Sequence, residues 1–185
     1  QPQAFPLLVF EKKITGHLSK LYKSFEDGKF DNTTGKITGE LNGKVLVHQD
    51  KRLEPFFRDI KRATFEYLEH FAIDKNIFEV NFVKSWFTIC DPGQSFPMHY
   101  HSCAHISWVY YIQTPGDNLI LHKRNPNEWF GDAFKFIQEH KYNNGDGYSI
   151  TPQPEHLVMF PGSLEHYTAC LLYTSPIPRD NTGSR

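Results

Sequence analysis

Four histidines in two segments have the residue type and spacing of a metal site. His99, His101 and His105 fall within the segment FPMHYHSCAHISWVYYIQTP, and His166 follows a second apolar segment, HLVMFPG. Residues i and i+2 of an extended chain point to the same side, so His99 and His101 direct two imidazoles at one point. A third imidazole from a distant strand, that of His166, gives a three-sided site with metal positions left open for substrate. The alternative is an exposed loop pair, because H-x-H arises by chance in a chain with ten histidines.

The other histidines favour structural roles. His105 follows His101 by four residues, and we expect it to face a barrel wall, as a support for the ligands or as a core residue. The remaining six lie on predicted helix surfaces, in polar stretches, or in and beside predicted strands: His17, His48, His70, His122, His140 and His156.

The elements that must hold these histidines are helices followed by many short strands. Apolar residues recur at helical spacing over about 18–25 and 52–72, and the second stripe is expected to pack on the outside of a sheet. From residue 77 the apolar period changes to two, which is typical of strands. This order predicts a mainly β fold with N-terminal helices, an antiparallel barrel or jelly roll. The predicted strands are 5–14, 77–89, 105–113, 118–123, 148–152, 156–162 and 165–173, with a long insertion at 124–147.

Length and composition bound the class of protein. The 185 residues fit one domain, and 39% hydrophobic with 22% charged residues is typical of a globular chain. The net charge of −1 gives no electrostatic footprint for nucleic acid, and no apolar run reaches membrane-spanning length. Three cysteines without metal-like spacing favour reduced thiols and a cytoplasmic location. The sequence carries no signal for an oligomeric state.

From Ser85 to Tyr167 the sequence resembles a known family. The segments SWFTICDPGQSFPMHYHSCAHISWVYYIQTP, NLIL and HLVMFPGSLEHYT, in this order, resemble the phage and marine-bacterial branch of the 2-oxoglutarate/Fe(II)-dependent oxygenases. That branch has an H-x-H, a Ser-Gly-Val-Tyr-Tyr-like strand and a late Leu-Phe-Pro-Ser-x-x-x-His segment. The counterparts here are HYH at 99–101, SWVYYI at 107–112 and MFPGSLEH at 159–166. The resemblance implies a double-stranded β-helix, a cupin-like jelly roll, in agreement with the strand order.

The resemblance implies an iron ion held by His99 and His166. The wider superfamily has a carboxylate two residues after the first histidine, where this chain has His101, as this branch commonly does. Two arrangements stay open: His101 takes the place of the carboxylate, or a carboxylate from elsewhere completes the triad, with Glu165 or Asp91 nearest in sequence. We favour His101 on the geometry of H-x-H.

The resemblance also implies a basic residue that pairs with the far carboxylate of 2-oxoglutarate. Arg179 is the only nearby match after the last histidine, and Lys123 is a second candidate. Tyr110 and Tyr111 are candidates to hydrogen-bond the same carboxylate. These tyrosines point to opposite sides of a strand, so packing is expected of at least one of them. Trp108 stands where the family has glycine, and its bulk is expected to reshape the pocket.

Arg179 lies in a tail that does not resemble the family's ending. The segment CLLYTSPIPRDNTGSR contains Pro176 and Pro178, which cannot donate to a strand ladder, and it resembles translated sequencing-adapter sequence. An ordinary disordered C-terminus is the alternative. We therefore predict a single oxygenase-like domain over 1–169 and a non-native or disordered tail over 170–185.

The expected function is that of an Fe(II)/2-oxoglutarate-dependent dioxygenase acting on a small molecule or a peptide side chain, such as a prolyl residue. Fe(II) is the expected cofactor and 2-oxoglutarate the expected co-substrate, with neither nucleic acid nor membrane as partner. The alternatives are a cupin-like metal-binding barrel without 2-oxoglutarate chemistry and an inactive structural homologue, such as a phage protein. A basic residue directed at the open side of the metal would favour the dioxygenase hypothesis over the two alternatives.

Overall fold

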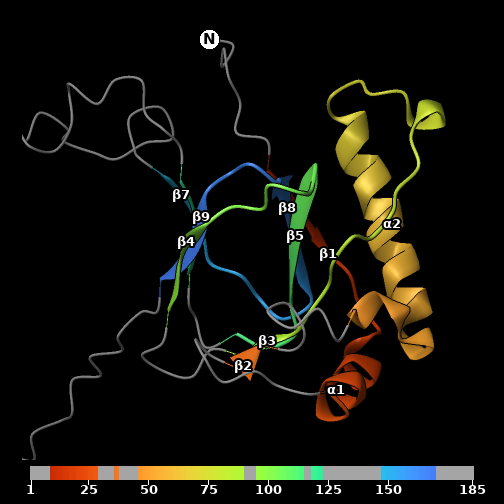
Figure 1. Ribbon diagram of the computed structural model, residues 1–185, viewed down its shortest axis with the longest axis vertical. Coiled ribbons are helices and arrows are strands. Elements are labelled where there is room, and N and C mark those ends of the chain that lie inside the picture. The colour runs from red at the N-terminus through yellow and green to blue at the C-terminus, as the bar shows by residue number, and fades with distance from the viewer. Residues whose placement is uncertain are drawn as a thin grey trace, which may run out of the picture.

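Two antiparallel sheets and a layer of helices make up the part of the chain that the structure describes (Figure 1). The structure is a computed structural model, and it describes residues 9–28, 36–37, 46–89, 95–114, 118–122 and 147–169. The first sheet contains, in spatial order, β1 (Phe10–Lys13), β8 (His156–Pro161) and β5 (Ile106–Tyr111). The second contains β4 (Phe96–His99), β9 (His166–Ala169), β6 (Asn118–His122) and β7 (Gly147–Ile150). A separate pair joins β2 (Lys36–Ile37) to β3 (Thr88–Ile89).

The strand pairings are nested along the chain. β6 pairs with β7, β5 with β8 and β4 with β9, all of them antiparallel, and β6 also pairs with β9. Successive parts of one long hairpin therefore pass from one sheet to the other. This winding brings β4 and β9 side by side, although the paired residues Phe96 and Thr168 are 72 positions apart.

Strand β8 separates two apolar cores, because its side chains alternate between the two faces of the first sheet. Leu157 and Met159 pack with the helices, whereas Val158 and Phe160 pack against the second sheet. All four side chains are fully buried. The second sheet completes the inter-sheet core with Leu119, Leu121 and Ile150.

The helical layer covers the outer face of the first sheet (Figure 1). It consists of α1 (Leu18–Glu26) and α2 (Glu54–Glu69), with the 3-10 turns η1 (Val47–Gln49), η2 (Lys51–Leu53) and η3 (Lys75–Ile77). The apolar stripe predicted over 52–72 packs on the outside of the sheet as expected, and the rings of Phe56 and Phe57 lie 6.3 and 6.0 Å from that of Trp108. Asp50 caps η2, the turn just before α2, by accepting the N–H of Arg52. Among the described helices, none has the length and apolar character that crossing a membrane requires.

Most predicted strands are present. Those at 105–113, 118–123, 148–152 and 156–162 are confirmed, with small shifts at their ends. The strands predicted at 5–14 and 165–173 are confirmed within their described parts, as β1 and β9. Residues 123–146, which include nearly all of the predicted insertion, and the predicted tail at 170–185 lie outside the described residues.

The strand predicted over 77–89 is wrong except at its end, where β3 forms. Phe78 is 48% exposed, whereas Phe82, on the same side of the predicted strand, is half-buried, so alternate residues of this segment do not share a buried face. Phe82 packs on Phe57 of α2, with ring centroids 5.0 Å apart. Contacts with the helix therefore set the side-chain directions here, and they override the alternation of apolar and polar residues in the sequence.

We expect Phe57→Ala to lower the free energy of unfolding by about 3–5 kcal/mol, the usual cost of truncating a buried phenylalanine. Phe57 is 5% exposed, and its ring contacts those of Phe56, Phe82 and Trp108. Urea denaturation measures the change. The control is Tyr22→Ala on α1, where the side chain is 41% exposed and a loss below about 1 kcal/mol is expected. Equal losses from the two variants would contradict this packing.

Candidate metal centre

The pairing of β4 with β9 places two of the predicted ligands opposite each other. His99 is the register partner of His166, and Phe96 is the partner of Thr168. Phe96 and His99 are three residues apart and would face opposite sides of a regular strand. A register shift between them turns both toward the side of the sheet that His166 and Thr168 face. The bulge is therefore what directs His99 to the inside of the two sheets.

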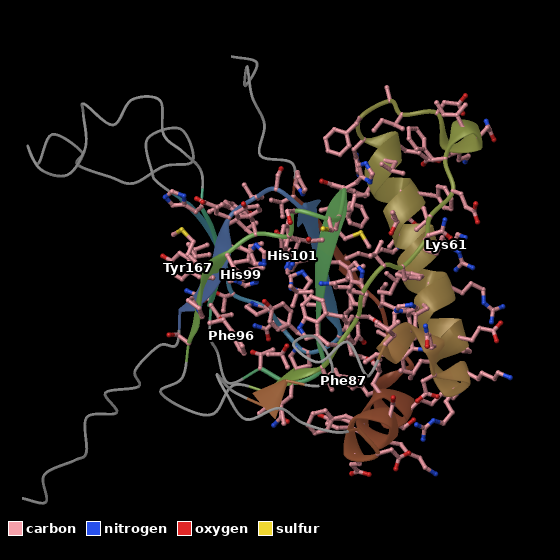
Figure 2. The ribbon with its side chains drawn as sticks, viewed as in Figure 1. Lys61, Phe87, Phe96, His99, His101 and Tyr167 are labelled. Atoms are coloured by element: carbon pink, nitrogen blue, oxygen red, sulfur yellow. The ribbon has the colours of Figure 1, made fainter. Side chains whose placement is uncertain are left out.

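Three histidines converge at this position. His99, His101 and His166 each offer one ring nitrogen, and these atoms lie within 4.8 Å of one another. The ring centroid of His166 lies 4.3 Å from that of His99 and 5.2 Å from that of His101. In Figure 2, His99 and His101 lie between the two sheets. The structure thus brings together all three residues that the sequence proposes as metal ligands.

Backbone carbonyl groups orient two of the imidazoles. Nδ1 of His99 lies 2.9 Å from the carbonyl oxygen of Pro97, and Nδ1 of His166 lies 2.9 Å from that of Leu164. A carbonyl oxygen only accepts hydrogen bonds, so each Nδ1 carries the proton and donates it. In the neutral ring, Nε2 then keeps its lone pair, which is the state that binds a metal ion. Both histidines repeat the same local contact, from residue i to the carbonyl of residue i−2.

Burial keeps His166 neutral. Its side chain is 4% exposed, and its ring lies 4.7 Å from that of Phe160 in the inter-sheet core. The pKa of His166 is lowered to about 4, chiefly by loss of hydration and to a smaller extent by the neighbouring His99 and His101, while the hydrogen bond to Leu164 raises it. An uncharged imidazole at neutral pH is ready to coordinate a cation without first releasing a proton.

The turn between β8 and β9 holds the backbone of His101. The N–H of His101 donates to the carbonyl of Gly162 (2.8 Å), and the N–H of Gly162 donates to the carbonyl of His105 (3.0 Å). A Cβ atom on Gly162 would lie 2.1 Å from the carbonyl oxygen of Ala104, so only glycine fits between the two segments. Gly162 therefore ties the loop that carries His101 to the turn that leads to His166.

Within the described residues, no carboxylate joins the three histidines. Glu165, one of the two carboxylates considered from the sequence, lies 3.3 Å from Nδ1 of His122 through its Oε2 atom. Glu165 therefore contacts His122 and not the three clustered histidines. Asp91 lies outside the described residues. His105, expected on a barrel wall, is exposed, and its carbonyl group rather than its ring supports the site.

The two tyrosines proposed for the co-substrate face opposite sides of β5. The hydroxyl of Tyr110 donates to the carbonyl of Ile14 (2.8 Å), and its ring packs on Phe56 of the helical layer at 4.9 Å. Tyr111 packs in the inter-sheet core, on the side of the sheet that His166 contacts. Of the pair, Tyr111 is thus the one on the inter-sheet side of β5, opposite His156 of β8.

The other residues considered for the pocket are placed as follows. Trp108 faces α2, so the expectation that its bulk reshapes the metal pocket is wrong. Lys123 and Arg179 lie outside the described residues. Sequence reasoning missed Gly162 as a support for His101 and Trp86, whose ring lies 5.7 Å from that of His101. The Pro-Gly pair before His166 signals a turn, but no sequence pattern indicates which loop the turn contacts.

The donor set fits a divalent ion such as Fe(II), because imidazole suits iron, zinc, copper and nickel. Metal–nitrogen bonds of about 2.1 Å place neighbouring ligand atoms about 3 Å apart. Nitrogen atoms up to 4.8 Å apart must therefore approach one another on binding. His166 is buried, whereas His99 is exposed and His101 is half-buried, so movement of the His99 and His101 side chains is what the packing permits.

We expect Gly162→Ala to weaken Co(II) binding by about 10- to 100-fold, the usual effect of removing a group that supports a metal ligand. The added methyl group displaces the 101–105 loop and withdraws His101, which also changes the visible spectrum of bound Co(II). The matched control is Gly16→Ala: Gly16 has a φ of +88°, so alanine is strained there, but its Cβ would meet nothing within 4 Å. Wild-type affinity and spectrum in Gly162→Ala would refute the role of this contact.

We expect the metal-free protein to lose stability through His166 as the pH falls. The folded-state pKa of about 4 lies below the ordinary value of 6.5, so between these values the unfolded chain binds a proton that the folded chain does not. The contribution of His166 is complete above pH 6.5 and declines by about 3 kcal/mol down to pH 4. Urea denaturation across this range, compared between the wild type and His166→Gln, measures it. Parallel pH curves for the two proteins would count against it.

One comparison with known proteins identifies a family. Residues 84–173 match the family model described as "Putative 2OG-Fe(II) oxygenase". The matched range contains His99, His101 and His166 and every strand of the two sheets except β1. No curated protein matches the chain. The segment 84–173, slightly under half of the chain, is thus similar to this 2OG-Fe(II) oxygenase family.

Proposed function

We propose that this chain is a dioxygenase that uses Fe(II) and 2-oxoglutarate to hydroxylate a small molecule or a peptide side chain. The observation that carries the proposal is the convergence of three histidine nitrogens within 4.8 Å, inside the range matched by the oxygenase family. His99, His101 and His166 would hold the ion. When bound, Fe(II) supplies coordination positions for co-substrate and O2, and the redox chemistry that yields succinate and a hydroxylated product.

The proposed fold is a double-stranded β-helix. It is supported by the nested pairings of β4 with β9, β5 with β8 and β6 with β7, which form two facing sheets. A jelly roll arises when one long antiparallel hairpin winds in this way. The proposed domain is 1–169, with 170–185 outside it, and the proposed setting is the reducing cytoplasm, on the unpaired cysteine usage of the sequence.

The ligand set favours an anionic co-substrate. Three neutral imidazoles leave the two positive charges of the ion uncompensated, whereas a carboxylate ligand would remove one of them. A dianion such as 2-oxoglutarate compensates this charge when it binds the metal. Phe160 and Leu121 close the buried side of His166 and exclude water from it, so the co-substrate and substrate approach from the side of the exposed His99.

The anchor of the far carboxylate of 2-oxoglutarate is proposed among the residues considered from the sequence. Tyr111 is the candidate whose strand position faces the second sheet, and Lys123 or Arg179 would supply the positive charge. Tyr110 is the weaker candidate, because its hydroxyl is bonded to the carbonyl of Ile14.

A second candidate function is a metal-binding barrel that does not use 2-oxoglutarate. The observation in its favour is that, in the described part of the chain, the metal cluster contains three histidines and no carboxylate. Such a barrel could be a three-histidine dioxygenase or an inactive homologue of the family.

We expect the purified chain to bind one Fe(II) per molecule and to convert 2-oxoglutarate to succinate with a suitable substrate. His99→Ala or His166→Ala should lower both the affinity for Fe(II) and succinate formation by about 100-fold or more, since each removes a ligand. Mass spectrometry of succinate with prolyl peptides, free amino acids and nucleobases as substrates measures turnover. His105→Ala, an exposed histidine of the same segment, is the control and should leave both unchanged.

Two outcomes separate the candidates. Stoichiometric Fe(II) binding without any change of the anaerobic absorption spectrum on adding 2-oxoglutarate would favour the second function. Absence of Fe(II) binding would refute the first function, and absence of binding to Fe(II), Zn(II) and Ni(II) alike would refute both.

A further inference from the structure

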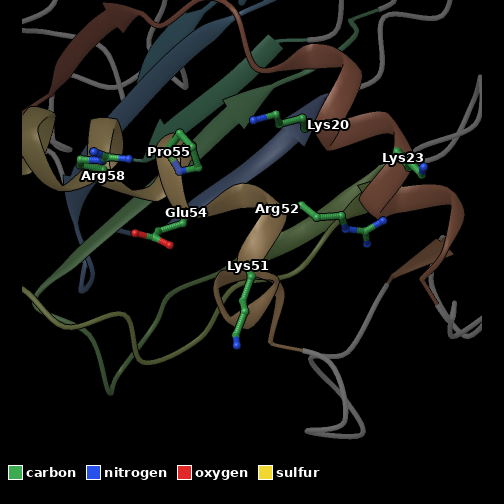
Figure 3. A pocket seen from close by; sticks show the side chains of 7 residues that line it. All are labelled: Lys20, Lys23, Lys51, Arg52, Glu54, Pro55 and Arg58. Carbon is green, nitrogen blue, oxygen red and sulfur yellow. The ribbon is translucent and has the colours of Figure 1, made fainter.

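A cleft in the helical layer lies apart from the histidines. It measures about 420 Å³ and is formed where α1, η2 and the first turns of α2 meet (Figure 3). The helices cover the outer face of the first sheet, whereas the histidines lie between the sheets, so the sheet separates the cleft from the metal cluster. The lining residues are Lys20, Lys23, Lys51, Arg52, Glu54, Pro55 and Arg58.

The wall of this cleft is strongly basic in a chain that is not. Five of its seven lining residues are basic and one is acidic, whereas the whole chain has 20 basic and 21 acidic residues. Helical spacing accounts for part of the clustering, because Lys20 and Lys23 are three residues apart on α1 and share one face. The 3-10 turn η2 adds Lys51 and Arg52 between the two helices.

Arg52 has a structural role, because its ion pairs hold α1 and η2, two walls of the cleft, together. Its guanidinium group binds Asp50 through Nε (2.9 Å) and Nη2 (2.6 Å) and binds Asp27 through Nη1. Asp50 also accepts a hydrogen bond from Ser24 of α1 (2.7 Å), so this network joins α1 to η2. The same contacts hold the pKa of Asp50 well below its usual range, which keeps the carboxylate charged. Arg52 is therefore compensated, and it sets the distance between the walls.

The other basic side chains of the wall lack an ion-pair partner in the part of the chain that the structure describes. Lys20, Lys23, Lys51 and Arg58 form no ion pair within the described residues, and Glu54 likewise has none there. Lys12 and Lys75, by contrast, pair with Glu66 and Glu69 elsewhere on the helical layer. Four positive charges around one concavity, against the single negative charge of Glu54, raise the local electrostatic potential, and an anion that enters the cleft lowers it.

The lining indicates the class of anion. Lysine ammonium groups bind phosphate as movable point charges, and the guanidinium of Arg58 offers a fork that matches phosphate oxygens. The lining contains no aromatic ring on which a nucleobase could stack, and Pro55 is its only apolar member. We propose that this cleft is a binding site for a small ligand with two or more linked phosphate groups. The site is independent of the proposed metal chemistry.

Isothermal titration of the full chain with pyrophosphate, near pH 7 and at about 150 mM salt, tests the proposal. We expect saturable binding of one pyrophosphate to the metal-free protein, since pyrophosphate would chelate a metal ion added to the same solution. Lys20→Gln with Arg58→Gln, from opposite walls of the cleft, should lower the affinity by about 100-fold, roughly tenfold for each positive charge removed. Inorganic phosphate and sulfate should bind more weakly, because each spans fewer of the four charges.

The matched control is Lys61→Gln with Lys84→Gln, which removes the same charge from side chains outside the lining. It should leave the affinity within about twofold of the wild type. Equal reductions of affinity in the two double variants would overturn the proposal, because they would show general attraction to a charged surface. So would the absence of pyrophosphate binding, or binding of a short single-stranded oligonucleotide in its place. Fe(II) binding is measured on separate, pyrophosphate-free samples of the same variants, so failure of this proposal and failure of the proposed function are distinguishable.

Discussion

The antiparallel pairing of β4 with β9 is the constraint on which the rest of the site depends. It makes His99 and His166 register partners, and a bulge in β4 turns His99 to the side that His166 occupies. No short-range contact could bring residues so distant in sequence together. The pairing itself requires the windings inside it, β5 on β8 and β6 on β7, because these set where β9 returns. The metal cluster is thus a consequence of the whole nested hairpin.

The three histidines are held to different degrees, and this difference suits a site that must bind and exchange ligands. His166 is buried against Phe160 and oriented by the carbonyl of Leu164, so it is the fixed member. His99 shares the carbonyl contact but is exposed. His101 depends on a loop that Gly162 fastens through two backbone hydrogen bonds. One rigid imidazole with two adjustable ones allows an open ligand set to close around an ion without disturbing the core.

Local pattern in the sequence was sufficient for much of this arrangement. The helix stripe around Phe56 and Phe57, the strands from 105 onward and the three histidines follow from periodicity, spacing and resemblance, because burial on one face leaves a periodic trace. The segment 77–89 also shows a periodic apolar pattern, but it packs on α2, so the strand predicted from its alternation is wrong except at its end. The role of Gly162 could not be predicted for another reason. Glycine is required there because of the carbonyl of Ala104, and such a contact between distant loops has no signal in one sequence. The order of the strands in each sheet likewise depends on contacts between distant segments, so it could not be predicted from one sequence.

Strand β8 connects the two halves of the molecule through its alternation alone. Met159 faces the helical layer that carries the basic cleft, and its neighbour Phe160 faces His166. A slip of one residue in the pairing of β8 with β5 would exchange these faces, placing core residues of the helix contact between the sheets. The packing of α2 therefore protects the register that the metal cluster needs, even though no residue of α2 belongs to that cluster. The helical layer thus contributes to the site by determining which side chains of β8 face the helices and which face the second sheet.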